Sequence, residues 1–79
     1  MARLPILSSD EVVKELKRAG FAPAPKRGKG SHVAMQGKDP TGRVRLVIIP
    51  KRKSLRRGTV QSILDQAGLT RDELLNLLR

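Results

Sequence analysis

Apolar residues recur with helical spacing at both ends of this 79-residue chain and with strand spacing in its middle. Residues 8–20 and 59–78 carry apolar stripes, whereas 31–36 and 43–49 are short apolar runs bounded by turn residues. We therefore predict a helix, a three-stranded meander whose first strand (21–25) is weak, a second helix and a short third helix. This order is typical of an α+β fold in which helices pack on one face of an antiparallel sheet. The other face should stay open.

Capping signals set the predicted starts of the helices. Ser8 and Glu11 have the spacing of a capping box, and Thr70 and Glu73 repeat that spacing before the last helix. Thr59 is the predicted N-cap of the middle helix.

The length and composition exclude several classes of protein. A chain this short forms one domain, 1–79, with a thin core and no room for a deep active site. It has no cysteine, which excludes a disulfide framework, a thiolate zinc site and a cysteine nucleophile. With one histidine and scattered carboxylates, we expect no metal and no other cofactor. The longest apolar stretch, Leu46 to Ile49, is too short to span a membrane, so we expect a cytoplasmic protein.

The positive charge is concentrated in the middle of the chain. Seventeen Lys and Arg face seven Asp and Glu, which gives a formal net charge of +10. Residues 26–57 hold eleven of these bases and one acid, whereas the rest of the chain is neutral. Such a segment favours nucleic acid as the partner over an anionic membrane or an acidic protein. Because the single aromatic residue, Phe21, is needed in the core, binding should depend on phosphates and on salt.

Strand parity predicts which side chains reach the open face. In the second strand, Val33 and Met35 belong under the helices, so His32 belongs on the open face. In the third strand we assign the even-numbered residues to the core. The open face then carries, beside His32, the odd-numbered residues of that strand: Arg43, Arg45, Val47 and Ile49. From parity alone, His32 is either part of a site or an exposed strand residue without a role.

Two ordered motifs resemble the HicA toxin family of bacterial toxin–antitoxin systems. The first is a helix ending in Gly20-Phe21, followed by a basic loop that runs into Gly30-Ser31-His32. The second is the run LRRGTVQSILDQAGL at 55–69, which is similar to the family's signature helix nearly position for position. The resemblance covers roughly residues 8–78.

The resemblance implies a double-stranded-RNA-binding-domain-like fold, α-β-β-β-α with a short further helix. It also implies a metal-independent endoribonuclease, an mRNA interferase, that is neutralised by a HicB-type antitoxin. The family's functional histidine corresponds to His32. Two positions depart from the family: Met35 replaces a frequent aromatic residue, and Lys51 and Arg52 occupy a stretch where many members have a second histidine. The second departure removes a candidate acid–base group.

These expectations define a candidate site. RNA carries its own nucleophile, the 2′-hydroxyl, and an imidazole can take its proton near neutral pH, so we expect His32 to act as general base. Phosphate contacts are expected from the surrounding polar and basic residues: Lys26, Arg27, Lys29, Ser31, Arg45, Lys51, Arg52, Lys53, Arg56 and Arg57. The acidic antitoxin is expected to cover His32, Arg45, Val47 and Ile49. Two alternatives stay open: a non-catalytic RNA-binding module and a basic protein that binds an acidic partner.

Overall fold

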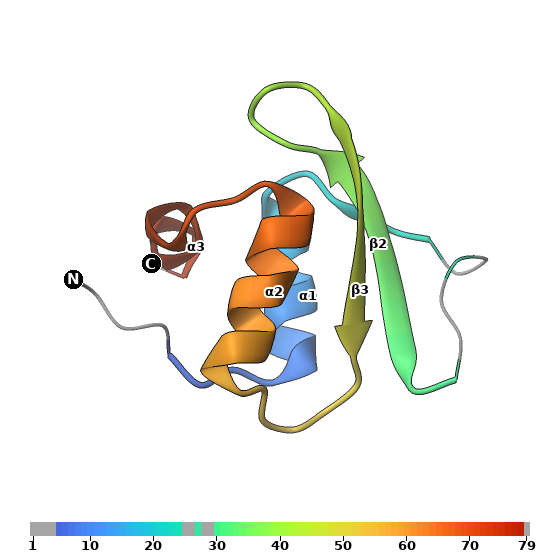
Figure 1. The fold of residues 1–79 in the computed structure, drawn as a ribbon, viewed down its shortest axis with the longest axis vertical. Helices are drawn as coiled ribbons and strands as arrows, with labels where there is room; N and C mark the ends of the chain where they lie inside the picture. Colours follow the sequence, from blue (N-terminus) through green and yellow to red (C-terminus); the bar gives the residue numbers. More distant parts are fainter. Residues whose placement is uncertain (1–4, 25–26, 28–29, 79) are drawn as a thin grey trace.

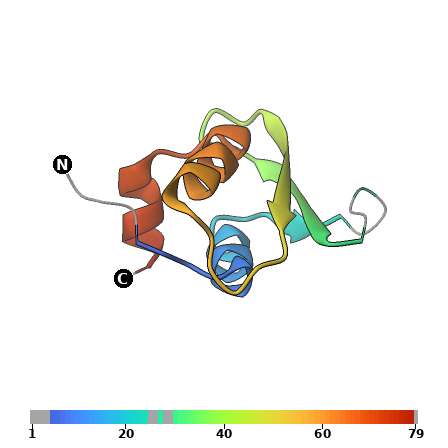
Figure 2. The same ribbon diagram turned by 60° about the horizontal axis from the view of Figure 1, so that its bottom comes forward.

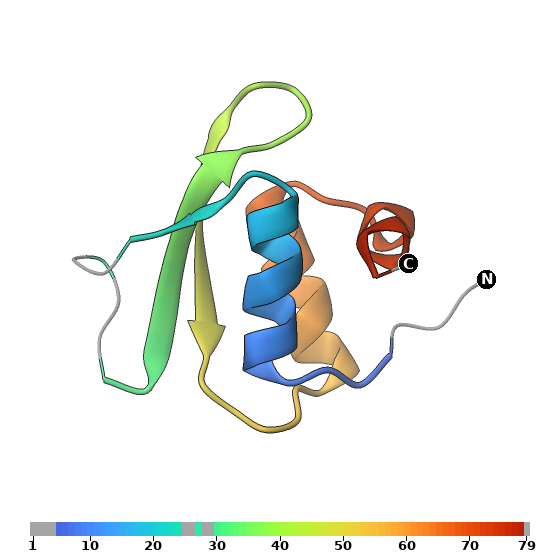
Figure 3. The same ribbon diagram turned by 180° about the vertical axis from the view of Figure 1, so that it is seen from behind.

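The computed structural model describes residues 5–24, 27 and 30–78. The described elements, in chain order, are α1 (Ser9–Arg18), β1 (Ala22–Pro23), β2 (His32–Lys38), β3 (Val44–Pro50), α2 (Arg57–Ala67) and α3 (Arg71–Leu77). The strands form one antiparallel sheet in the order β1-β2-β3. Figures 1 and 3 show α1 and α2 together on one face of this sheet, with α3 beyond them. The predicted α+β fold is therefore confirmed.

The two predicted capping boxes are present. Ser8 Oγ accepts the Glu11 N–H at 3.1 Å, and the Ser8 N–H donates to Glu11 Oε1 at 2.9 Å. Thr70 and Glu73 make the same reciprocal pair at the start of α3. The predicted start of α2 is wrong by a few residues. Its N-cap is Arg56 and not Thr59, and the Arg56 side chain makes no capping hydrogen bond. These local signals fix two helix starts without any tertiary contact.

The core lies between the sheet and the two long helices. Phe21 and Met35 are both buried in it, as predicted. The remaining core residues come from all helices, β3 and two connecting segments: Leu7, Val12, Leu16, Val47, Ile49, Leu55, Val60, Ile63, Leu64, Ala67 and Leu74. The segment before α1 and the segment before α2 are joined by a bridge between Leu7 and Leu55.

The side-chain parity predicted for β3 is wrong. Val33 lies opposite Ile49, and Met35 opposite Val47, and directly opposed residues share a face of the sheet. Val47 and Ile49 are therefore core residues, each 0% exposed, whereas Val44 is 56% exposed. The sequence of β3 is apolar at both parities, so alternation within the strand could not decide between the faces. The pairing register with β2 decided it.

The turn between β2 and β3 is organised by the buried carboxylate of Asp39. Its Oδ1 atom accepts from the Thr41 hydroxyl at 2.6 Å, the Thr41 N–H at 2.9 Å and the Arg43 N–H at 3.0 Å. Its Oδ2 atom accepts from Arg45 Nε at 2.8 Å. The Thr41 hydroxyl, followed by the Arg45 guanidinium, holds the pKa of Asp39 well below its usual range. These bonds let an arginine lie on the helical side of the sheet.

Each edge of the sheet has a feature that disfavours pairing with another strand. β1 is one edge strand, and it contains Pro23, a residue that edge strands tolerate because it cannot donate to a ladder. At the other edge, the Ile48 N–H of β3 donates to Gln66 Oε1 of α2 at 2.9 Å. A helix side chain thus satisfies an edge amide that another strand would otherwise pair with.

Candidate nucleic-acid interface

His32 is exposed at the first position of β2, on the open face of the sheet and opposite Pro50, the last residue of β3. Its position on the open face agrees with the prediction from parity. The Nδ1 atom of the ring lies 3.4 Å from Ser31 Oγ. If Nδ1 carries the ring proton and Ser31 accepts it, Nε2 is the free acceptor that a general base requires.

A loop of three consecutive cations, Lys51–Lys53, leaves β3 beside His32, and all three residues are exposed. The Lys51 N–H donates to the carbonyl oxygen of Ser31 at 2.7 Å, so the loop is bonded to the residue that precedes His32. The Arg52 backbone is bonded to Ser9 at the start of α1. The cations are therefore held at the same end of the sheet as the imidazole, at the bottom of Figure 1.

A shallow groove of about 450 Å³ lies against this basic loop. The residues that line it come from the start of α1, β2 and the loop: Ser8, Ser9, Asp10, Val33, Lys51, Arg52 and Lys53. Val33 faces the helices, whereas His32 faces away from them. The groove and the imidazole therefore lie on opposite faces of the sheet at the same end. A polyanionic strand passing around this end would meet both.

Two further cations lie at the same end of the molecule. Arg56 is the exposed N-cap of α2, and Arg57 is its first residue, also exposed. Figure 2, in which this end comes forward, shows the connection from β3 passing beneath the start of α1 to reach α2. Arg27 is exposed in the segment before β2, whereas Lys26 and Lys29 lie outside the described residues.

The family model for the HicA toxin of bacterial toxin–antitoxin systems matches residues 9–69. The chain belongs to the HicA toxin family. The matched region contains His32, the basic loop and α2. Membership implies a cognate antitoxin as partner. Searches of curated proteins and of solved structures gave no match.

Arg45 of this HicA-family chain does not join His32, contrary to the prediction. It lies opposite Gly37, five residues along β2 from His32, a separation of roughly 17 Å at strand spacing. Its guanidinium is bound to Asp39 and turned toward the helices. Arg45 therefore has a structural role at the far end of the sheet, because the carboxylate that binds it lies in the β2–β3 turn.

The predicted antitoxin surface of the HicA-family chain also needs correction. Val47 and Ile49 are buried, so no partner can reach them without unfolding the chain. The apolar side chains that do share the open face with His32 are Val44, Leu46 and Ile48, because they lie opposite Lys38, Gln36 and Ala34. Val44 is exposed, and the other two are half-buried.

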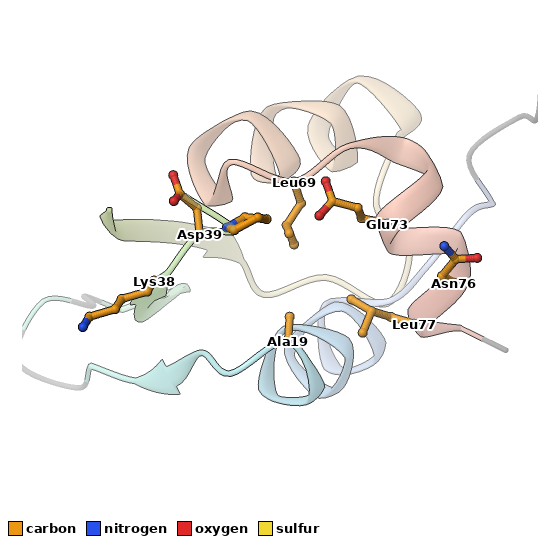
Figure 4. Close-up of a pocket in the computed structure, with 8 residues that line it drawn as sticks. Ala19, Lys38, Asp39, Leu69, Glu73, Asn76 and Leu77 are labelled. Atoms are coloured by element: carbon orange, nitrogen blue, oxygen red, sulfur yellow. The ribbon is translucent and has the colours of Figure 1, made fainter. Parts of the chain in front are cut away.

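A second hollow of the HicA-family chain, about 440 Å³, lies at the opposite end, between the β2–β3 turn, α3 and the end of α1. Figure 4 shows Leu69 pointing toward Ala19, with Glu73 and Leu77 from α3 beside them. Among the described residues, none of the predicted site residues lines this hollow. It also contains one cation, Lys38, and two carboxylates, Asp39 and Glu73, so its charge does not suit RNA.

Within 5–24, 27 and 30–78, no three His, Asp or Glu side chains are close enough to hold a metal ion. Nor is any helix of the described chain long and apolar enough to cross a membrane. The described side chains at the His32 end offer one imidazole, hydroxyl groups, the carboxylate of Asp10 and the guanidinium or ammonium groups of the basic loop.

Ser9 is a residue of this region that sequence reasoning missed. Its hydroxyl contacts Arg52, 43 residues away in the chain. No local pattern marks Ser9 apart from its place directly after the Ser8 cap, so only the folded structure reveals it.

Proposed function

We propose that this HicA-family toxin is a metal-independent endoribonuclease that cleaves mRNA in the cytoplasm, with His32 as general base. The observation that carries the proposal is the exposed imidazole at the sheet end where the Lys51–Lys53 loop is hydrogen-bonded to Ser31. A base and a cluster of cations at one open end suit a substrate that brings both phosphate and nucleophile.

The proposed reaction begins when His32 Nε2 takes the proton of a ribose 2′-hydroxyl. The 2′-oxygen forms a bond to the adjacent phosphorus, and the bond from phosphorus to the 5′-oxygen of the next nucleotide breaks. The products are a 2′,3′-cyclic phosphate and a 5′-hydroxyl, whose proton comes from solvent because the site is open. The imidazolium of His32 then releases its proton to solvent, so the proposed reaction needs neither a metal ion nor a change of oxidation state.

Cations of the basic loop would stabilise the charge that builds on the phosphate oxygens. Lys51, Arg52 and Lys53 supply three positive charges next to the Ser31–His32 peptide, and Arg56 and Arg57 extend the positive surface to the start of α2. With few aromatic side chains, the site would bind the RNA backbone more than its bases, which predicts weak sequence preference.

The cognate antitoxin is proposed to be an acidic, HicB-type protein that lies over the open face and covers His32. The described residues around His32 form an open, shallow surface, so the proposed control is a partner that covers it. The cations around His32 would accelerate association with the acidic antitoxin. The apolar side chains Val44, Leu46 and Ile48 would supply a centre from which water is excluded.

The test is cleavage of a labelled RNA by purified protein in the presence of a chelator. The parent should cut the RNA and leave 2′,3′-cyclic phosphate ends, and His32→Ala should be inactive but folded, because an exposed side chain leaves no cavity. Gln36→Ala, another exposed position on the same face of β2, should keep full activity. Equal cleavage by a folded His32→Ala protein would refute the role of His32. Binding without cleavage by the parent would instead indicate a non-catalytic RNA-binding module.

A further inference from the structure

The start of α1 holds the basic loop through a single residue, Ser9. The Ser9 hydroxyl accepts the Arg52 N–H at 3.0 Å and lies 3.0 Å from the Arg52 carbonyl oxygen, to which it donates. The Ser9 N–H donates to the same carbonyl oxygen at 2.9 Å. Ser9 is 6% exposed, so these bonds are partly shielded from water. One small side chain therefore satisfies both backbone polar groups of the central residue in the cationic loop.

Such an anchor helps to order the loop, because the like charges of its side chains repel one another. Lys51, Arg52 and Lys53 carry like charges at adjacent positions and extend into solvent, so their mutual repulsion favours a spread loop. Two backbone bonds hold its ends, from the Lys51 N–H to Ser31 and from the Leu55 N–H to Leu7, each at 2.7 Å. Arg52 lies between these ends, and of these anchors only that of Arg52 uses a side chain.

We propose that Ser9 is a positioning residue of the ribonuclease site, which fixes the Lys51–Lys53 cations relative to His32; this rests on the proposed function. The chain of contacts runs from the Ser9 hydroxyl to the Arg52 backbone and from Lys51 to the Ser31 carbonyl oxygen, next to His32. Ser9 does not contact the reacting atoms in this arrangement. It limits where the cations can be when a phosphate lies against the imidazole.

Ser9 can be separated from the stability of α1 itself. The N-cap of α1 is Ser8, whose hydroxyl bonds to Glu11 and not to the loop. Removing the Ser9 hydroxyl therefore leaves the capping box in place, together with the bond from the Ser9 N–H to Arg52. The expected result is a folded protein whose basic loop is less ordered, with a fall in turnover and in the number of phosphates bound at once.

The experiment compares Ser9→Ala with Ser9→Thr, which keeps the hydroxyl, and with Ser62→Ala, the same change at an exposed position of α2. For Ser9→Ala we expect kcat to fall at least about tenfold. The slope of log affinity against log salt should fall by roughly 0.7–0.9 for each phosphate that the loop no longer binds. The slope is measured in the His32→Ala background, in which the RNA stays intact. Ser9→Thr should restore both quantities, and Ser62→Ala should match the parent.

The outcomes distinguish this role from a merely structural one and from failure of the proposed function. A folded Ser9→Ala protein with parental kcat and salt slope overturns the proposal, even if it melts at a lower temperature. If Ser9→Ala does not fold, hydrogen exchange of the parent decides: an Arg52 amide exchanging as fast as that of Lys53 overturns the proposal, and a protected one supports it. A parent that cleaves no RNA overturns the proposed function, and this assignment with it.

Discussion

Arg45 Nε lies 2.8 Å from Asp39 Oδ2, and this pairing places a charged residue of β3 on the helical side of the sheet. Asp39 is held in turn by Thr41 and Arg43 within the same turn. Gly68, the C-cap of α2, packs directly on the pair: a Cβ atom there would lie 2.8 Å from Asp39 Cβ and 3.3 Å from Arg45 Nε. The cationic segment is thus divided between a structural arginine at one end of the sheet and candidate RNA contacts at the other.

The depressed pKa of Asp39 predicts how stability depends on acid. A carboxyl group with a lowered folded-state pKa stabilises the fold at pH values above its unfolded pKa, here near 3.8, and loses that contribution as the pH falls through the folded-state value. The free energy of unfolding should therefore decline as the pH drops below about 4. Asp39→Asn should lower stability at neutral pH and flatten this decline. Urea titrations between pH 7 and pH 2 measure both, with exposed Asp72→Asn as the control that should retain the parental decline.

Two glycine-to-alanine changes, one in α2 and one at its C-cap, should have opposite effects on the stability of the protein. Gly68 has φ = +70° and no space for a methyl group, so Gly68→Ala should destabilise the protein by about 2–4 kcal/mol. Gly58 lies in the first turn of α2 with open space around it, so Gly58→Ala should stabilise the protein by about 0.5–1 kcal/mol. Chemical denaturation gives both values. A neutral Gly68→Ala would contradict the close packing of α2 on Asp39.

The parity of β3 can be tested with one substitution at two positions. Val47 is 0% exposed and opposite Met35, so Val47→Asp should bury an unpaired carboxylate and unfold the chain. Val44 is 56% exposed on the other face, so Val44→Asp should change stability by less than about 1 kcal/mol. Circular dichroism melts distinguish the two. If the Val47→Asp protein folds, the side chain of Val47 lies on the open face and the parity assigned to β3 is wrong.

The same exposed face should bind the antitoxin. Lys38→Glu combined with Val44→Asp places acidic groups at two directly opposed positions of that face. We expect at least about a hundredfold weaker binding of an acidic partner, because the double variant removes both the charge attraction and the apolar surface. Lys17→Glu, an exposed change on α1, is the control. Calorimetry with the purified antitoxin checks this, and parental affinity of the double variant would place the interface elsewhere.

The basic loop should account for much of the salt dependence of RNA binding. Lys51→Gln with Lys53→Gln should weaken binding to all RNA sequences alike and reduce the slope of log affinity against log salt by roughly 1.4–1.8. Lys14→Gln with Lys17→Gln removes the same charge from the exposed side of α1 and should leave this slope nearly unchanged. Binding is measured with His32→Ala protein at several salt concentrations. Equal slopes for the two double variants would mean that the cations of the loop do not contact the RNA.

The sequence by itself determined the features that depend on near neighbours. The capping boxes at Ser8 and Thr70 bond three residues ahead, so their spacing located two helix starts. The α+β order follows from the change of apolar period along the chain, and the basic segment is visible as composition. The exposure of His32 could also be predicted, because Val33 and Met35 are the larger apolar side chains of β2 and lie on the other face.

Only the tertiary structure decided the features whose partners are distant or interchangeable. β3 is apolar on both faces, so its parity was set by pairing with β2, and Arg45 followed it inward because Asp39 could bind it. The cationic loop is hydrogen-bonded through the Arg52 backbone to Ser9, 43 residues away. Such interactions leave no periodic trace in the sequence, because a hydroxyl or a carboxylate acquires its partner only when the chain has folded.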